Sequence, residues 1–167
     1  MSRDDDFGVF YQASYHRLVG QLTVMTGSLE DAEDAVQEAF ARASTRWATL
    51  RAYDMPEAWV RRVALNLATS GLRRTRRQLA ALARLRPPTT ESAHPTDRLA
   101  IQAGLQRLPL HYRQVLVLHY GADLSVEQVA QQLRLPTGTV KSRLARARAA
   151  LGAYLGQGQE ERGHARG

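Results

Sequence analysis

The sequence contains no cysteine, and this absence excludes disulfide-stapled folds and thiolate metal sites. It also lacks any apolar run of the roughly 18 residues that a membrane span requires. No basic n-region followed by an apolar h-region opens the chain, so we expect a cytoplasmic protein. The histidines are scattered, and the sequence has no Gly-rich phosphate loop and no His and carboxylate set at metal spacing. We therefore expect no metal, no cofactor and no enzymatic activity.

Lysine is nearly absent, since 22 of the 23 basic residues are arginine and only Lys141 is not. Against 16 acidic residues they give a net charge of +7, and the isoelectric point is near 10.5. Such an excess favours polyanionic partners, although it does not separate DNA from RNA. The preference for arginine is also typical of a GC-rich genome.

Apolar residues at helical spacing predict three helices in the first half of the chain. The first starts near Phe7 and ends at Gly27, and the second begins at Ser28 with Asp31 three residues later. The third opens near Pro56. We expect the second helix to bury a stripe made of Leu29, Ala32, Val36, Ala39, Phe40, Ala43 and Trp47.

The second and third of these helices differ in the sign of their charge. The first half of the second helix carries five acids, namely Glu30, Asp31, Glu33, Asp34 and Glu38. They complement the helix dipole, which is one explanation of the cluster. From residue 59 to residue 86, by contrast, the chain has eight arginines and no acid, so we expect the third helix to lie along nucleic acid.

A break in periodicity separates two domains. Residues 87–97 contain three prolines among small polar residues and predict a flexible linker. The expected organisation is therefore a first domain at 1–86, a second at 98–155 and a disordered tail at 156–167. The fold class is all-α, with two small helical domains of which the second contains a helix-turn-helix.

The helix-turn-helix lies at residues 125–148. Ser125 and Gln128 have the spacing of a capping box, which predicts a helix start. Pro136 disfavours helical geometry at the residue before it and ends this helix. Thr137 is then predicted as the N-cap of a second helix.

The second helix of this motif has a cationic face without acids. Its N-terminal half, the part of a recognition helix that meets base edges and phosphates, carries Gly138, Thr139, Lys141, Ser142, Arg143 and Arg146. The alternative is a two-helix core element whose arginines face solvent. The tight turn and the small residues at the helix start favour DNA binding.

Four sequence blocks, in this order along the chain, resemble a known family, the extracytoplasmic-function sigma factors. These are bacterial RNA polymerase initiation subunits built from region 2 and region 4. The resemblance covers nearly all of the chain from Phe7 to Leu155. The blocks are DAEDAVQEAFARA (31–43), WVRRVALNLATSGLRRTRR (59–77), LPLHYRQVLVLHY (108–120) and LSVEQVAQQLRLPTGTVKSRLARARAAL (124–151).

The resemblance implies that the acidic helix binds the clamp helices of the polymerase's largest subunit. The residues that match this surface are Asp31, Asp34, Gln37, Glu38 and Arg42. A solvated acidic face is the alternative, and Phe40 belongs to the core. The family also uses region 4 to hold the polymerase flap, and an anti-sigma factor is a common partner that no residue here demonstrates.

The third helix resembles the part of region 2 that binds the melted minus-10 element. Asn66 matches a position that captures a flipped base, and Tyr53 lies in a turn that matches the specificity loop. Tyr53 either stacks on a base or packs as a helix staple. Phosphate contacts are implied for Arg61, Arg62, Arg73, Arg74, Arg76 and Arg77. The sequence departs from the family at Ser70, where many members have Asp, and the next residue is Gly71.

Region 4 implies contacts with the minus-35 element from Thr137, Thr139, Lys141, Ser142, Arg143 and Arg146. The function implied is a specificity subunit that directs promoter recognition and transcription initiation by core RNA polymerase. One alternative is a stand-alone helix-turn-helix regulator that never binds polymerase. Another is a decoy that holds an inhibitor without initiating transcription.

Overall fold

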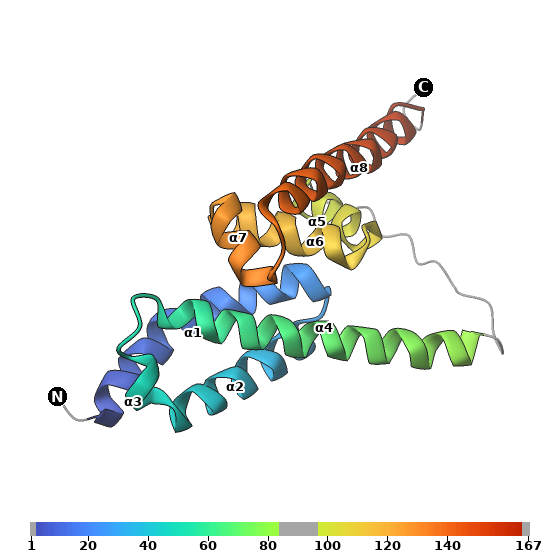
Figure 1. Ribbon diagram of the computed structural model, residues 1–167. Helices are drawn as coiled ribbons and strands as arrows, with labels where there is room; N and C mark the ends of the chain where they lie inside the picture. The colour runs from blue at the N-terminus through green and yellow to red at the C-terminus, as the bar shows by residue number, and fades with distance from the viewer. Residues whose placement is uncertain (1–2, 84–96, 165–167) are drawn as a thin grey trace. The chain divides into compact units, whose positions relative to one another are not determined.

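The computed structural model describes residues 3–83 and 97–164, and every regular element within them is a helix (Figure 1). The predicted all-α fold is confirmed. Contacts divide the chain into two compact units, Met1–Ser92 and Ala93–Gly167. Apart from Asp97, the predicted linker lies outside the described residues, and Asp97 already belongs to the first helix of the second unit.

The first unit contains the helices α1 (Arg3–Thr26), α2 (Leu29–Thr45), α3 (Trp47–Leu50) and α4 (Pro56–Ala83). The predicted break between α1 and α2 is confirmed. Gly27 takes a left-handed φ of 80°, which ends α1. The Ser28 hydroxyl then accepts the Asp31 N–H at 3.1 Å and caps α2.

Three helices of the first unit pack on one another, since α4 contacts both α1 and α2, which also contact each other. Fully buried apolar side chains hold them together, namely Leu18, Leu22, Met25, Val36 and Val60. At the two ends of the predicted α2 stripe, the burial of Leu29 is wrong, whereas the burial of Trp47 is confirmed although Trp47 lies on α3. Leu29 is 56% exposed because it starts the helix ahead of the packed face. Trp47 is buried from α3, because the backbone leaves helical geometry at Arg46.

The second unit contains α5 (Asp97–Arg107), α6 (Leu110–Leu116), a π-helical turn η1 (Val117–Gly121), α7 (Val126–Leu133) and α8 (Thr137–His164). Both bonds of the predicted capping box form, at 2.9 and 3.2 Å between Ser125 and Gln128. Arg134 ends α7 in a left-handed conformation with φ 55°. Thr137 is the first residue of α8 and not its N-cap, because the Pro136 carbonyl already accepts the Val140 N–H.

The long helix α8 is the central helix of the second unit, because α5, α6 and α7 all pack on it. Its buried residues Val140, Leu144 and Ala147 complete a core with Val115 and Val129. The prediction of a disordered tail from residue 156 is wrong for residues 156–164, whose backbone remains helical. The stretch continues a helix that is already nucleated, so each added residue needs no new nucleus.

Candidate nucleic-acid and polymerase interfaces

The start of α8 displays the residues predicted to read DNA. Thr137, Lys141, Ser142 and Arg146 are exposed, and Thr139 and Arg143 are half-buried. Val140, Leu144 and Ala147 of α8 are buried on another side of the helix, so packing against α6 and α7 fixes which face is presented. The Ser142 hydroxyl donates to the Thr139 carbonyl at 3.0 Å.

Two exposed residues outside α8 lie near its arginines, and neither was predicted as a site residue. His111 of α6 is exposed and feels the charge of Arg143. Partial burial lowers the pKa of His111, and the nearby Arg143 guanidinium lowers it further. Tyr120 is 57% exposed and its hydroxyl accepts a hydrogen bond from Arg148 Nη1 at 2.9 Å. The Tyr120–Arg148 pair is 28 residues apart in sequence, so no local pattern reveals it.

The solvent face of α4 carries the predicted minus-10 residues. Asn66 is exposed, and Arg62 one turn before it is half-buried. Further along the helix the exposed residues are Arg73, Arg74, Arg76 and Arg77. None of these last four has an ion-pair partner among the residues that the structure describes. Their charge is therefore available to a polyanion.

Ser70 and Gly71 lie in the same stretch of α4 and do not interrupt the helix. A side chain added at Gly71 would meet nothing within 4 Å. Packing in the first unit therefore does not require this glycine.

Arg61 was predicted to contact phosphate, but its side chain is buried and does not present its guanidinium to solvent. Its side chain is only 5% exposed and pairs with Glu57 one turn earlier on α4. Its Nε also donates to Gln21 Oε1 on α1 at 3.3 Å. Because successive residues of a helix are turned by about 100°, Arg61 faces α1 while Arg62 does not. Burial lowers the pKa of the Arg61 guanidinium, against the opposing charge of Glu57.

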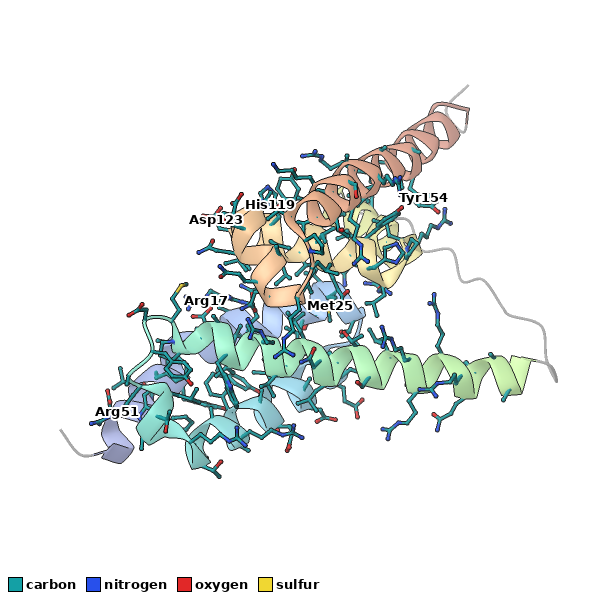
Figure 2. The ribbon with its side chains drawn as sticks, viewed as in Figure 1. Arg17, Met25, Arg51, His119, Asp123 and Tyr154 are labelled. Atoms are coloured by element: carbon teal, nitrogen blue, oxygen red, sulfur yellow. The ribbon has the colours of Figure 1, made fainter. Side chains whose placement is uncertain are left out.

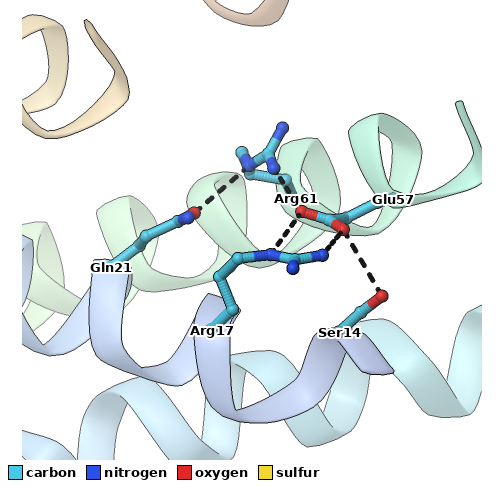
Figure 3. Close-up of polar contacts among 5 residues, drawn as sticks. All are labelled: Ser14, Arg17, Gln21, Glu57 and Arg61. Atoms are coloured by element: carbon cyan, nitrogen blue, oxygen red, sulfur yellow. Dashed lines mark hydrogen bonds and ion pairs between the residues drawn. The ribbon is translucent and has the colours of Figure 1, made fainter. Parts of the chain in front are cut away.

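Glu57 also binds a second arginine, which no sequence pattern indicated (Figure 3). Arg17 of α1 donates from Nε to Glu57 Oε1 at 3.3 Å and from Nη2 to Oε2. Ser14 Oγ also donates to Oε2 at 3.4 Å. This hydrogen bonding raises the pKa of the Arg17 guanidinium. Arg17 and Glu57 are 40 residues apart, so spacing gave no sign of the pair.

The turn before α4 exposes two large side chains. Tyr53 is 51% exposed and Met55 is 53% exposed. The backbone of the turn is held by a bond from the Tyr53 N–H to the Leu50 carbonyl at 3.0 Å. Of the two roles considered for Tyr53, stacking is the one that needs such exposure.

The outer face of α2 presents the acidic surface. All five residues predicted to bind polymerase are exposed: Asp31, Asp34, Gln37, Glu38 and Arg42. Glu38 pairs with Arg42 at 2.7 Å, and Gln37 donates to the Tyr15 hydroxyl of α1 at 3.2 Å. Phe40 is 2% exposed and belongs to the core, as expected. The surface is thus net acidic and has few internal ion pairs.

The described residues, 3–83 and 97–164, contain neither a candidate membrane-spanning helix nor a candidate metal site. No helix there is long and apolar enough to cross a membrane. No group of His, Asp and Glu side chains there has the geometry to hold a metal ion.

Comparison with known families divides the chain where the fold does. The family described as Sigma-70 region 2 matches residues 10–78, within the first unit. The family described as Sigma-70, region 4 matches residues 98–151, within the second unit.

Curated relatives are similar over most of the chain. SigM of Mycobacterium tuberculosis, an ECF RNA polymerase sigma factor, is 33% identical over 144 residues, which cover 85% of this chain and 74% of SigM. SigW of Bacillus subtilis, described in the same terms, is 30% identical over 146 residues, with 76% of each chain covered. The RNA polymerase sigma-E factor of Streptomyces coelicolor is 33% identical over 123 residues, with 72% and 70% covered.

Two solved structures have a similar fold. CnrH, in complex with the cytosolic domain of CnrY, is 27% identical with a TM-score of 0.63, and covers 92% of this chain and 90% of its own. The sigma factor RpoE, in complex with the anti-sigma factor NepR from Bartonella quintana, has a TM-score of 0.71 at 24% identity, with 90% and 96% covered.

Proposed function

Because the chain belongs to the extracytoplasmic-function family of RNA polymerase sigma factors, we propose that its two units divide promoter recognition between them. The chain directs promoter recognition and transcription initiation by core RNA polymerase. Proteins of this kind act as specificity subunits and not as enzymes. The observation that carries the proposal is the order of the matches, with region 2 on the first unit and region 4 on the second.

In the second unit, α8 enters the major groove of the minus-35 element. Its exposed start brings arginine donors to guanine edges, where a guanidinium binds O6 and N7 together. The backbone N–H groups at the start of the helix favour a phosphate. The proposed contacts are Thr137, Thr139, Lys141, Ser142, Arg143 and Arg146.

In the first unit, α4 and the turn before it bind the minus-10 element as it melts. Asn66 would hydrogen-bond a flipped base and the exposed Tyr53 ring would stack on one. This binding offsets the unstacking cost of a few kcal/mol. Phosphates along the same face would be neutralised by Arg62, Arg73, Arg74, Arg76 and Arg77.

The polymerase surface is α2. Exposed carboxylates of Asp31, Asp34 and Glu38, with Gln37 and Arg42 beside them, suit a basic helical partner, the clamp helices of the largest subunit. The second unit would contact the polymerase flap. Both contacts place the two DNA-reading units on one enzyme.

Run-off transcription with core polymerase of the source organism on its genomic DNA tests the proposal. We expect discrete transcripts that require the chain and share upstream minus-35 and minus-10 sequences. The control is core polymerase alone. If the free chain instead binds duplex operators tightly and never associates with polymerase, the stand-alone regulator is correct and this proposal is not. If the chain associates with polymerase but starts no transcript, the decoy is correct.

A regulatory protein partner is a second proposal. Its support is CnrH, which is similar over 92% of this chain and is solved with the cytosolic domain of CnrY bound. An anti-sigma factor would act by occupying surfaces that polymerase needs. Affinity purification from the source cells, with and without added core polymerase, tests this. A partner that polymerase displaces supports it, and recovery of polymerase subunits alone contradicts it.

A further inference from the structure

We propose that Tyr120 of η1 is a further DNA contact, whose hydroxyl donates a hydrogen bond to a backbone phosphate beside the minus-35 major groove. Arg148 of α8 orients that hydroxyl and adds a cation at the same place. The inference rests on the proposed function, because it assumes that the start of α8 lies in promoter DNA. It deepens that function by adding a contact from outside the recognition helix.

The first argument is the place of Arg148 on α8. Arg148 follows Lys141 by seven residues, so the two side chains differ in direction by only about 20° around the helix. Both are exposed and lie about 10 Å apart along the helix axis. Ala145 between them is exposed and too small to cover the surface. Arg148 therefore continues one edge of the proposed DNA face, the Lys141–Arg148 edge.

The second argument is which part of the helix-turn-helix adjoins this edge. Hydrogen bonds at the start of α7 lower the pKa of Glu127, first from its own N–H and then from Ser125, and the Lys141 charge lowers it further. The start of α7 therefore lies beside Lys141. In a helix-turn-helix the first helix crosses the DNA backbone while the second enters the groove. The Lys141–Arg148 edge thus faces a phosphate backbone.

The third argument is the unused donor of Tyr120. Its hydroxyl accepts a hydrogen bond from Arg148 Nη1 at 2.9 Å, and its own proton has no acceptor among the described residues. A hydroxyl that accepts a bond from a cation becomes a stronger donor, because the two bonds polarise each other. Arg148 has no ion-pair partner within 3–83 and 97–164, so its charge is not neutralised there. A hydroxyl donor beside such a cation suits a phosphate oxygen.

The fourth argument is that the backbone holds Tyr120 in place. The Ala122 N–H bonds the Val117 carbonyl at 2.9 Å and closes the π-helical turn. His119, labelled in Figure 2, has its Nδ1 2.7 Å from the Leu124 carbonyl oxygen and ties the turn to the segment before α7. The Tyr120 side chain nevertheless remains 57% exposed. A side chain on a fixed backbone loses less entropy when it binds.

The test is promoter binding by holoenzyme that contains the full chain with Tyr120→Phe, which removes the hydroxyl and keeps the ring. The probe is promoter DNA with one phosphate near the minus-35 element replaced by an uncharged methylphosphonate, one position at a time on each strand. The matched control is Tyr154→Phe, because the half-buried Tyr154 also lies beside an arginine, with Arg107 Cζ 5.7 Å from its ring centroid. Tyr154 lies six residues beyond Arg148 on α8 and is turned about 120° from it (Figure 2).

We expect Tyr120→Phe to lower the affinity for unmodified promoter about tenfold, as the loss of one hydrogen bond to a charged group does. At one methylphosphonate position the wild type should lose affinity and Tyr120→Phe should lose nothing further, since both changes then remove the same contact. Arg148→Gln should lower the slope of log affinity against log salt by about 0.9, whereas Tyr120→Phe should keep the slope because it removes no charge. Tyr154→Phe should bind as the wild type does.

The inference is overturned if Tyr120→Phe binds unmodified promoter with wild-type affinity, or if Tyr154→Phe loses as much. It is equally overturned if the loss adds to that of the methylphosphonate at every position, because the hydroxyl would then only support the second unit. An unchanged salt slope for Arg148→Gln overturns it as well, since no cation would then stand beside the phosphate. Failure of the proposed function looks different. In that case wild-type holoenzyme itself shows no promoter-dependent binding.

Discussion

Arg61 and Arg62 are neighbours in the sequence, yet the helix turns one into the α1–α4 contact and leaves the other near the solvent face. The buried one is stabilised by Glu57 and Gln21. A buried guanidinium without a partner is costly, because the desolvation penalty is then not compensated. The same carboxylate orients Arg17 at the surface. One residue, Glu57, thus pairs with one buried and one exposed arginine.

Replacing Glu57 with Ala should destabilise the first unit by on the order of 3 kcal/mol, because Arg61 remains buried without its ion pair. Both tryptophans, Trp47 and Trp59, belong to the first unit, so tryptophan fluorescence during urea unfolding reports on that unit alone. The control is Glu38→Ala, which breaks an exposed pair with Arg42 and should cost about 0.5 kcal/mol. Equal losses for the two variants would contradict the role given to Glu57.

His111 should titrate below its ordinary value of about 6.5. Burial lowers the pKa of His111 first and the Arg143 charge lowers it further. Because the folded chain binds this proton less readily than the unfolded chain, the stabilising contribution is complete above pH 6.5 and declines as pH falls toward the folded value. NMR titration of the imidazole Cε1–H measures the midpoint. Arg143→Ala should raise that midpoint in part, and an unchanged midpoint would show that the two side chains are not close.

At the scale of elements, α4 and α8 are both long helices with one buried and one cationic side. In each, apolar residues against the neighbouring helices fix the rotation, and the arginines occupy what remains. A glycine inside a helix lowers helix stability, but a helix that is packed against its neighbours tolerates it. α4 passes through Gly71 without a break, because its N-terminal half is anchored by Val60, Ala64 and Ala68 in the core.

Gly71→Ala should stabilise the first unit by about 0.5 to 1 kcal/mol, since alanine has the higher helix propensity and the added methyl group meets no neighbour. Urea unfolding followed by tryptophan fluorescence measures this. Gly104→Ala in α5 is the comparison, because its new methyl carbon would lie 2.9 Å from Leu151 Cδ1 of α8. We expect a smaller gain or a loss there, followed by circular dichroism. If Gly71→Ala stabilises the chain but weakens promoter binding, the open surface at Gly71 serves DNA.

At the scale of the whole molecule, the proposed function places two DNA-reading units on one polymerase. The acidic surface on α2 and the cationic faces of α4 and α8 have opposite signs, which would steer polymerase and DNA to different surfaces. The net charge of +7 hides this division, because it adds the two together.

Reversing Asp31 and Asp34 to Lys should impair association with core polymerase while leaving the unit folded. Both side chains are exposed, so the cost in stability is confined to a loss of helix-dipole interaction, about 0.5 kcal/mol each. The neutral pair Asp31→Asn and Asp34→Asn should have an intermediate effect. Fluorescence anisotropy of labelled chain against core polymerase measures the affinities. Unchanged affinity after the reversal would refute the assignment of α2.

The sequence by itself determined most of the helices, the break between α1 and α2 and the family, although it did not predict the break at Arg46 or the helical backbone of residues 156–164. It did so because these signals are local: a capping serine, a proline or an apolar repeat acts within a few residues of itself. The errors about which arginines are buried or paired are of the opposite kind. Arg61 lies in an arginine-rich stretch without acids, which is typical of a DNA contact. It is buried only because α1 packs on α4. Arg17 and Glu57, 40 residues apart, became partners only when α1 packed against α4. The orientation of a side chain on a packed helix depends on what the other helices cover, and that was settled by the tertiary structure.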